Sequence, residues 1–169
     1  DLMGSWTSHL PPELELGGLT VLGMNAEELQ ANPRAAERVV HDLNLKRFYQ
    51  DSAGSVVDPE KIEAHKVETS PLTQFVGFIT KQADRANSQR SSPIETAKCA
   101  LSWIKGWAEG GASLGAMDSK QAEAQRKWDL AGTAIAYLKL KKFATLEDRA
   151  AIEPWLMKWA DAARAHFDD

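Results

Sequence analysis

Residues 125–141 read QRKWDLAGTAIAYLKLK, and this stretch decides the fold. Its middle, 130–136, is made mostly of alanine, glycine and threonine. So many small side chains let neighbouring helices approach closely on more than one side. A glycine inside a helix costs about 1 kcal/mol relative to alanine, so close packing has to compensate at Gly132. The stretch therefore predicts a helix packed between other helices.

Helix-start signals recur along the rest of the chain. Asp58-Pro59 and Ser70-Pro71 each place a capping side chain before a proline at the first helical position. Ser92-Pro93 does the same, and Glu95 is placed to complete a capping box with Ser92. Apolar residues at helical spacing follow these signals. The pattern predicts an all-α protein with short connections and helices at about 59–68, 71–86, 93–109, 119–142 (opened by Asp118) and 146–167.

The first 57 residues have a different character. Paired prolines and glycines and an alternating apolar stretch suggest an extended arm, followed by a short helix from Asn32-Pro33 to about Asp42. RFYQDSAGSVVDP (47–59) then reads as a long loop, and such loops are usually functional or disordered. We therefore expect an N-terminal arm and short helix over 1–46, a loop over 47–58, and a helical part over 59–169.

Composition excludes several classes of function. A net charge of −4 without a clustered basic surface gives no support for a nucleic-acid partner. No apolar run approaches the roughly 18 to 20 residues of a membrane span, so no membrane partner is expected. A single cysteine, Cys99, rules out an internal disulfide and a cysteine-based zinc site. The four histidines lack ligand spacing. We expect neither a metal nor a cofactor.

Gln121, Gln125 and Trp128 form the strongest candidate site. They share one face of the predicted helix, with Arg126 and Lys127 beside it. Amides, a guanidinium and an indole suit an acidic sugar, because arginine pairs with carboxylates and an indole stacks on a sugar ring. Two structural alternatives stay open: Gln121 could close a capping box with Asp118, and Trp128 could belong to the core.

Three segments carry a resemblance to a known family. AKCALSWIKGWAEGGASL (97–114), QRKWDLAGTAIAYLKLK (125–141) and IEPWLMKWADAARAHF (152–167) are similar to alginate lyases of the (α/α)-toroid type. RFYQDSAGSVVDP resembles the mobile lid over the sugar cleft of that family. The resemblance implies that Gln121 and Trp128 face the cleft and that Tyr49, with Arg47, contacts substrate from the lid. It covers about residues 47–167 and is weak before them.

The resemblance also implies an activity, the cleavage of a uronate polymer by β-elimination. In that family an Asn-His pair, an arginine and a tyrosine do the chemistry, and this chain contains no Asn-His dipeptide. The catalytic groups are therefore expected beyond Asp169, with the chain as the N-terminal half of a toroid that a second polypeptide or the rest of the same gene product completes. Mannuronate, guluronate and glucuronate polymers, and endo and exo cleavage, all stay open.

Three further expectations follow. An incomplete toroid exposes an apolar edge, placed here at 131–136 and at Trp155 and Trp159, so residues 1–169 alone are expected to be inactive and prone to aggregate. The chain begins with Asp1, which fits either a cleaved secretory signal or a chain trimmed at its start; the secretory signal would make this a periplasmic or secreted protein. The alternative function is a non-catalytic helical module that binds carbohydrate or serves as a scaffold.

Overall fold

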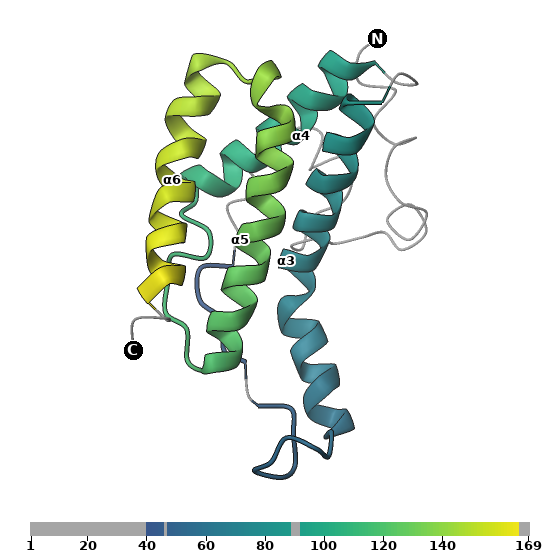
Figure 1. Ribbon diagram of the computed structural model, residues 1–169, viewed down its shortest axis with the longest axis vertical. Helices are drawn as coiled ribbons and strands as arrows, with labels where there is room; N and C mark the ends of the chain where they lie inside the picture. The colour runs from purple at the N-terminus through teal and green to yellow at the C-terminus, as the bar shows by residue number, and fades with distance from the viewer. Residues whose placement is uncertain (1–39, 46, 89–91, 166–169) are drawn as a thin grey trace.

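The computed structural model describes residues 40–45, 47–88 and 92–165, and in them the protein is built from helices. The predicted arm and the start of the short helix lie outside these residues. The described helices are α3 (Pro59–Ala86), α4 (Pro93–Glu109), α5 (Lys120–Leu140), the short 3-10 helix η3 (Lys141–Phe143) and α6 (Leu146–Ala165) (Figure 1). The described part of the chain contains no strand beyond two isolated bridges. The predicted all-α class is confirmed.

α3 is one continuous helix where the sequence predicts two. Asp58 caps it as expected, accepting hydrogen bonds from the backbone N–H groups of Glu60 and Lys61. Pro71, expected to open a second helix, lies inside α3. A proline there removes one helical hydrogen bond. The buried apolar face that continues on the C-terminal side of Pro71 outweighs this loss; it comprises Leu72, Phe75, Phe78, Ile79 and Ala83.

Two other predicted caps are corrected. Ser92 makes no side-chain capping bond at the start of α4; its carbonyl oxygen instead accepts hydrogen bonds from the N–H and hydroxyl of Thr96. At α5 the cap is Ser119, whose hydroxyl accepts a bond from Ala122 N–H at 3.1 Å. Asp118 does not cap α5, because its carboxylate accepts a hydrogen bond from the N–H of Leu45 at 2.9 Å.

The four described α-helices pack as two successive pairs: α4 crosses α3 obliquely, and α6 runs antiparallel to α5 (Figure 1). In the first pair, the rings of Phe75 on α3 and Trp107 on α4 stack with centroids 3.8 Å apart. In the second, Trp159 Nε1 on α6 donates to the carbonyl of Arg126 on α5 at 3.1 Å. Further along these two helices, the hydroxyl of Tyr137 donates to the carboxylate of Glu153 at 2.7 Å. The two contacts between α5 and α6 fix the opposite directions of these two helices.

The two pairs of helices pack side by side. α3 contacts α5, and α4 contacts α6. Lys139 and Asp84, near the C-terminal ends of α5 and α3, form an ion pair at 2.6 Å, so these two helices run in the same direction (Figure 1). Trp155 Nε1 on α6 donates to the carbonyl of Ala112, just after α4, at 2.9 Å. α3 and α5 therefore form one layer of parallel helices, and α4 contacts α6 beside this layer.

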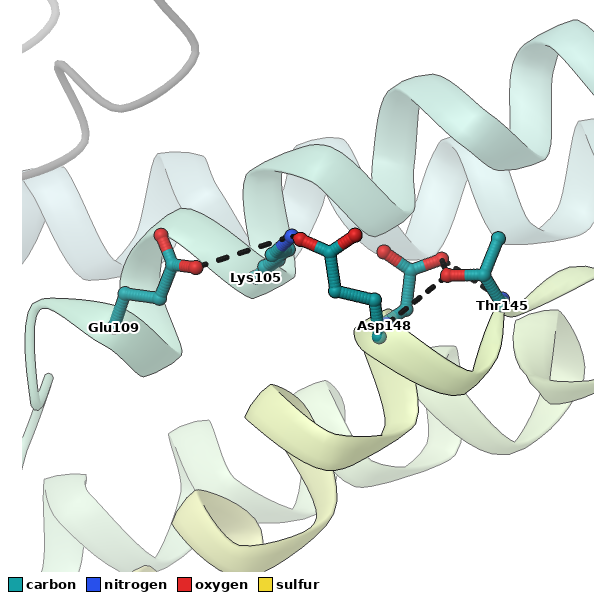
Figure 2. Close-up of polar contacts among 5 residues, drawn as sticks. Lys105, Glu109, Thr145 and Asp148 are labelled. Carbon is teal, nitrogen blue, oxygen red and sulfur yellow. Dashed lines mark hydrogen bonds and ion pairs between the residues drawn. The ribbon is translucent and has the colours of Figure 1, made fainter.

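Polar contacts join the start of α6 to α4, as Figure 2 shows. The N–H of Thr145 donates to the carboxylate of Asp148 at 2.9 Å, and the N–H of Asp148 donates back to the Thr145 hydroxyl at 3.1 Å. This reciprocal pair caps α6. Lys105 on α4 bridges Glu147 on α6 and, at 3.9 Å, Glu109. The bridge to Glu147 raises the pKa of Lys105.

The segment before the loop, residues 40–45, is extended and buries two leucines. Leu43 N–H donates to the carbonyl of Ala116 at 3.1 Å, and Asp118 N–H donates to the carbonyl of Leu43 at 3.2 Å. Leu43 and Leu45 are each 1% exposed. The short helix predicted to reach Asp42 is therefore wrong over residues 40–42, where pairing with the turn after α4 satisfies the backbone instead.

The predicted apolar edge is only partly present. Trp155 and Trp159 are buried, so that part of the prediction is wrong; both indole N–H groups reach backbone carbonyls inside the fold. On α5, Thr133 and Ala136 are buried, while Ile135 is 53% exposed. None of the helices in the described residues is long and apolar enough to cross a membrane.

Candidate functional site

The candidate site on α5 is a stripe of Gln121, Gln125 and Trp128. At about 100° per residue, these side chains and Gly132 lie within about 60° of one another around the helix. Trp128 is 57% exposed, so the alternative that it belongs to the core is wrong. Gln121 and Gln125 are half-buried. The stripe runs along the boundary between the packed and the exposed faces of α5.

The stripe borders α3. A Cβ built on Gly132 would lie 2.5 Å from Cγ1 of Val76, so the two helices nearly touch there. Because the helices run parallel, residues of α3 about 56 positions earlier lie level with residues of α5. On this register His65 and Thr69, which share a face with Val76, lie level with Gln121 and Gln125. The Thr69 hydroxyl donates to the His65 carbonyl at 2.9 Å, and burial lowers the pKa of His65.

A buried carboxylate, that of Asp129, accepts hydrogen bonds from one residue of the stripe. Asp129 is 5% exposed, and both of its carboxylate oxygens accept hydrogen bonds from Nε2 of Gln125, at 3.0 and 3.1 Å. Burial raises the pKa of Asp129 to about 6, and the Gln125 bond opposes the rise. Asp129 is not among the site residues predicted from the sequence, although a glutamine followed four residues later by an aspartate on one helix is a recognisable signal.

Arg126 does not lie beside the stripe as predicted. It is 9% exposed, and burial lowers the pKa of its guanidinium, which the charge of Glu123 partly offsets. The reason is the helical period, which places residue 126 on the side of α5 that faces α6, where its carbonyl meets Trp159. The guanidinium expected for a uronate carboxylate therefore has to come from elsewhere.

Arg47 and Tyr49 lie together in the loop before α3. The guanidinium of Arg47 lies over the Tyr49 ring at 5.7 Å from its centroid, and its Nη2 donates to the Ser52 carbonyl at 2.6 Å. Tyr49 pairs with Val57 across an antiparallel bridge. The structure therefore brings together the two side chains that the resemblance assigns to substrate contact from the lid.

This loop is internally hydrogen-bonded. The carboxylate of Asp51 accepts bonds from the Ser55 hydroxyl and from the N–H groups of Ser55 and Val56. Those bonds, the Ser55 hydroxyl first, lower the pKa of Asp51 to about 2. Gly54 has φ +74°, which favours glycine and closes the turn. The loop is therefore an ordered, hydrogen-bonded turn, and Arg47 and Tyr49 lie on it.

The loop and the stripe lie toward the same end of the α3–α5 layer. Figure 1 shows the loop at the end of the molecule where α3 begins and near the end where α5 begins. The ring of Phe48 meets His65 of α3 edge-on at 5.5 Å, and His65 is level with Gln121. At about 1.5 Å per residue, Asp58 lies about 10 Å beyond that level along α3. The assignment of all four residues to one substrate site stays a prediction.

The remaining candidates for chemistry are structural. Burial raises the pKa of the Cys99 thiol to about 12, so it is a poor nucleophile. Burial also raises the pKa of Tyr137, whose hydroxyl is bonded to Glu153. Among the described residues, no group of three or more His, Cys, Asp or Glu side chains could hold a metal ion.

Comparison with known proteins finds polysaccharide and alginate lyases among the relatives of the chain. No protein-family model matches the chain. The chain is 37% identical to a polysaccharide lyase of Stenotrophomonas maltophilia over 131 residues, which are 76% of this chain and 39% of that protein. It is 30% identical to an alginate lyase of Azotobacter vinelandii over 152 residues, 84% of this chain and 40% of that protein. An alginate lyase of Pseudomonas fluorescens is 27% identical to the chain over 135 residues, which are 75% of this chain and 36% of that protein.

The chain is thus a relative of the polysaccharide lyases. More particularly, the resemblance to the alginate lyases is confirmed over the part of their length that the chain matches. The chain spans about two fifths of the length of these curated relatives.

Proposed function

We propose that the chain forms part of the substrate cleft of a polysaccharide lyase that cleaves a uronate polymer, such as alginate, polymannuronate or glucuronan, by β-elimination. The observation that carries the proposal is the exposed indole of Trp128, in one stripe with the amides of Gln121 and Gln125. An indole left 57% exposed while four other tryptophans are buried is available to stack on a sugar ring.

The lid-like loop supplies the charge that the stripe lacks. Arg47 is exposed, and its guanidinium can pair with a uronate carboxylate once it leaves the Ser52 carbonyl. Tyr49 lies next to it with a hydroxyl that can donate to the sugar. Because Arg126 is buried, Arg47 is the arginine best placed for this role. A polyanionic substrate is thus held by stacking and amide bonds on α5 and by a cation from the loop.

We also propose that the two helix pairs, α3 with α4 and α5 with α6, belong to an (α/α) toroid. In such a ring each helical hairpin contributes one helix to an inner layer and one to an outer layer. α3 and α5, the first helices of the two hairpins, lie in one parallel layer, and the second helices, α4 and α6, contact each other. The exposed side chains of Ile135 and Leu138 on α5 offer a surface for further helices.

The catalytic base and acid belong to the same proposal. The described residues near the stripe provide His65, whose pKa burial lowers, but no Asn-His pair. We propose that the base, the acid and the group that neutralises the carboxylate come from a part of the relatives' length that the chain does not span, on the same gene product or on a second polypeptide. A polymeric substrate outside the cell would favour a periplasmic or secreted location.

The test uses the full-length gene product and a panel of polymers. Polymannuronate, polyguluronate, glucuronan and a neutral mannan are supplied separately, and the ultraviolet absorbance of an unsaturated uronide product is followed. The proposal expects product from at least one uronate polymer and none from mannan. Binding to these polymers without any unsaturated product would support a non-catalytic carbohydrate-binding module instead.

A further inference from the structure

The amide of Gln125 is the best-restrained group of the stripe. Its Nε2 donates to both oxygens of the Asp129 carboxylate, at 3.0 and 3.1 Å. A carboxylate only accepts hydrogen bonds, so the nitrogen end of the amide has to point toward Asp129. The oxygen end, Oε1, is then the part of Gln125 that is left to accept a hydrogen bond from another molecule.

The surroundings of Asp129 make this restraint firm. The carboxylate is 5% exposed, so water competes little for its oxygens, and a buried carboxylate depends on the donors that the protein gives it. Its backbone carbonyl is also engaged, accepting the hydroxyl of Thr133 at 2.7 Å. The pKa of Asp129, about 6, leaves the group mostly ionised at neutral pH, which is the state that fixes the amide.

We infer that Asp129 is a positioning residue of the sugar site, which holds Gln125 with its carbonyl oxygen toward the ligand. This position of the stripe then accepts a hydrogen bond from a sugar hydroxyl, and disfavours a uronate carboxylate, which has no hydrogen to give. The inference rests on the proposed function. It adds that hydroxyl recognition lies at Gln125, with the carboxylate bound elsewhere.

The decisive experiment compares substitutions of Asp129 in two backgrounds. Affinity for a mannuronate trisaccharide is measured by calorimetry on the full-length protein at neutral pH, and melting temperature is measured alongside. In Asp129→Asn, the new asparagine can bond either end of the Gln125 amide. The fraction of molecules with Gln125 in the binding-competent orientation therefore falls to about half, and affinity falls about twofold. Asp129→Leu removes the anchor, and the cost of immobilising a free side chain lowers affinity about 3- to 10-fold.

The same two substitutions are then made in a Gln125→Ala background. If Asp129 acts through Gln125, neither substitution changes affinity further there, although any change in melting temperature persists. Equal losses of affinity in both backgrounds, or no loss in the first, would overturn the inference. A wild-type protein that binds no uronate oligosaccharide at all would instead overturn the proposed function, so the two failures are distinguishable.

Discussion

Gly132 of α5 and Val76 of α3 lie so close that any side chain on residue 132 would meet the Val76 methyl group, 2.5 Å from the position of its Cβ. This contact sets the spacing of the α3–α5 layer. It also explains why a glycine is placed inside a 21-residue helix, where it costs about 1 kcal/mol in helix propensity.

Gly132→Ala should destabilise the protein, by about 1 to 3 kcal/mol, although alanine is the better helix former. The free energy of unfolding in urea measures this. Val76→Ala removes the methyl group that a new Cβ would meet, so the double variant should recover part of the loss. If the unfolding free energy of the double variant is no higher than the value expected from adding the two single-variant losses, this contact does not set the spacing.

Gly77→Ala is the matched control, one residue along α3 from Val76. A Cβ at Gly77 would meet nothing within 4 Å. The substitution should therefore stabilise the protein by up to about 1 kcal/mol through helix propensity alone, as measured by the same urea titration.

Trp128→Ala should weaken binding of a mannuronate oligosaccharide about tenfold, as expected of an anchoring aromatic, while changing stability by no more than about 0.5 kcal/mol. Calorimetric titration and thermal melting measure the two effects. Trp159→Ala is the contrasting variant: Trp159 is fully buried, so its loss should cost about 3 to 5 kcal/mol. A Trp128 variant that melts far lower yet binds normally would refute the site assignment.

Tyr49→Phe should lower turnover on a uronate polymer about 3- to 10-fold, the worth of one lost neutral hydrogen bond. The melting temperature should not change, because the Tyr49 ring and its bridge to Val57 are retained. Phe48→Leu is the companion variant. It removes the ring contact with His65, and we expect it to lower stability more than Tyr49→Phe does. Wild-type turnover in Tyr49→Phe would show that its hydroxyl does not contact substrate.

Asp129→Asn should become increasingly stabilising as pH rises. The pKa of Asp129 is raised in the folded state from 3.8 to about 6, so the folded protein favours the protonated form. The stability linked to that form is fully present below about pH 4 and is lost as pH rises through about 6. The loss is on the order of 3 kcal/mol, and asparagine, which mimics the protonated acid, avoids it. The difference in unfolding free energy between the variant and wild type should grow from pH 4 to pH 7 and then level off.

The sequence determined the helices and the composition of the candidate stripe. Capping residues and apolar spacing are local, so α4 was predicted at its observed bounds, and the period of 3.6 residues placed Gln121, Gln125 and Trp128 on one face. One local signal gave a wrong prediction. Ser70-Pro71 predicted a helix start, but the buried apolar face beyond it keeps α3 continuous.

Only the tertiary structure decided which face of each helix is covered. Helical period groups residues into faces, but it does not say which neighbour packs on each face. The sequence therefore placed Trp155 and Trp159 on an exposed edge and Arg126 beside the site, whereas the packed helices bury all three side chains. The link between Asp129 and Gln125 was likewise decided by burial, because a carboxylate holds an amide firmly only where surrounding helices exclude water.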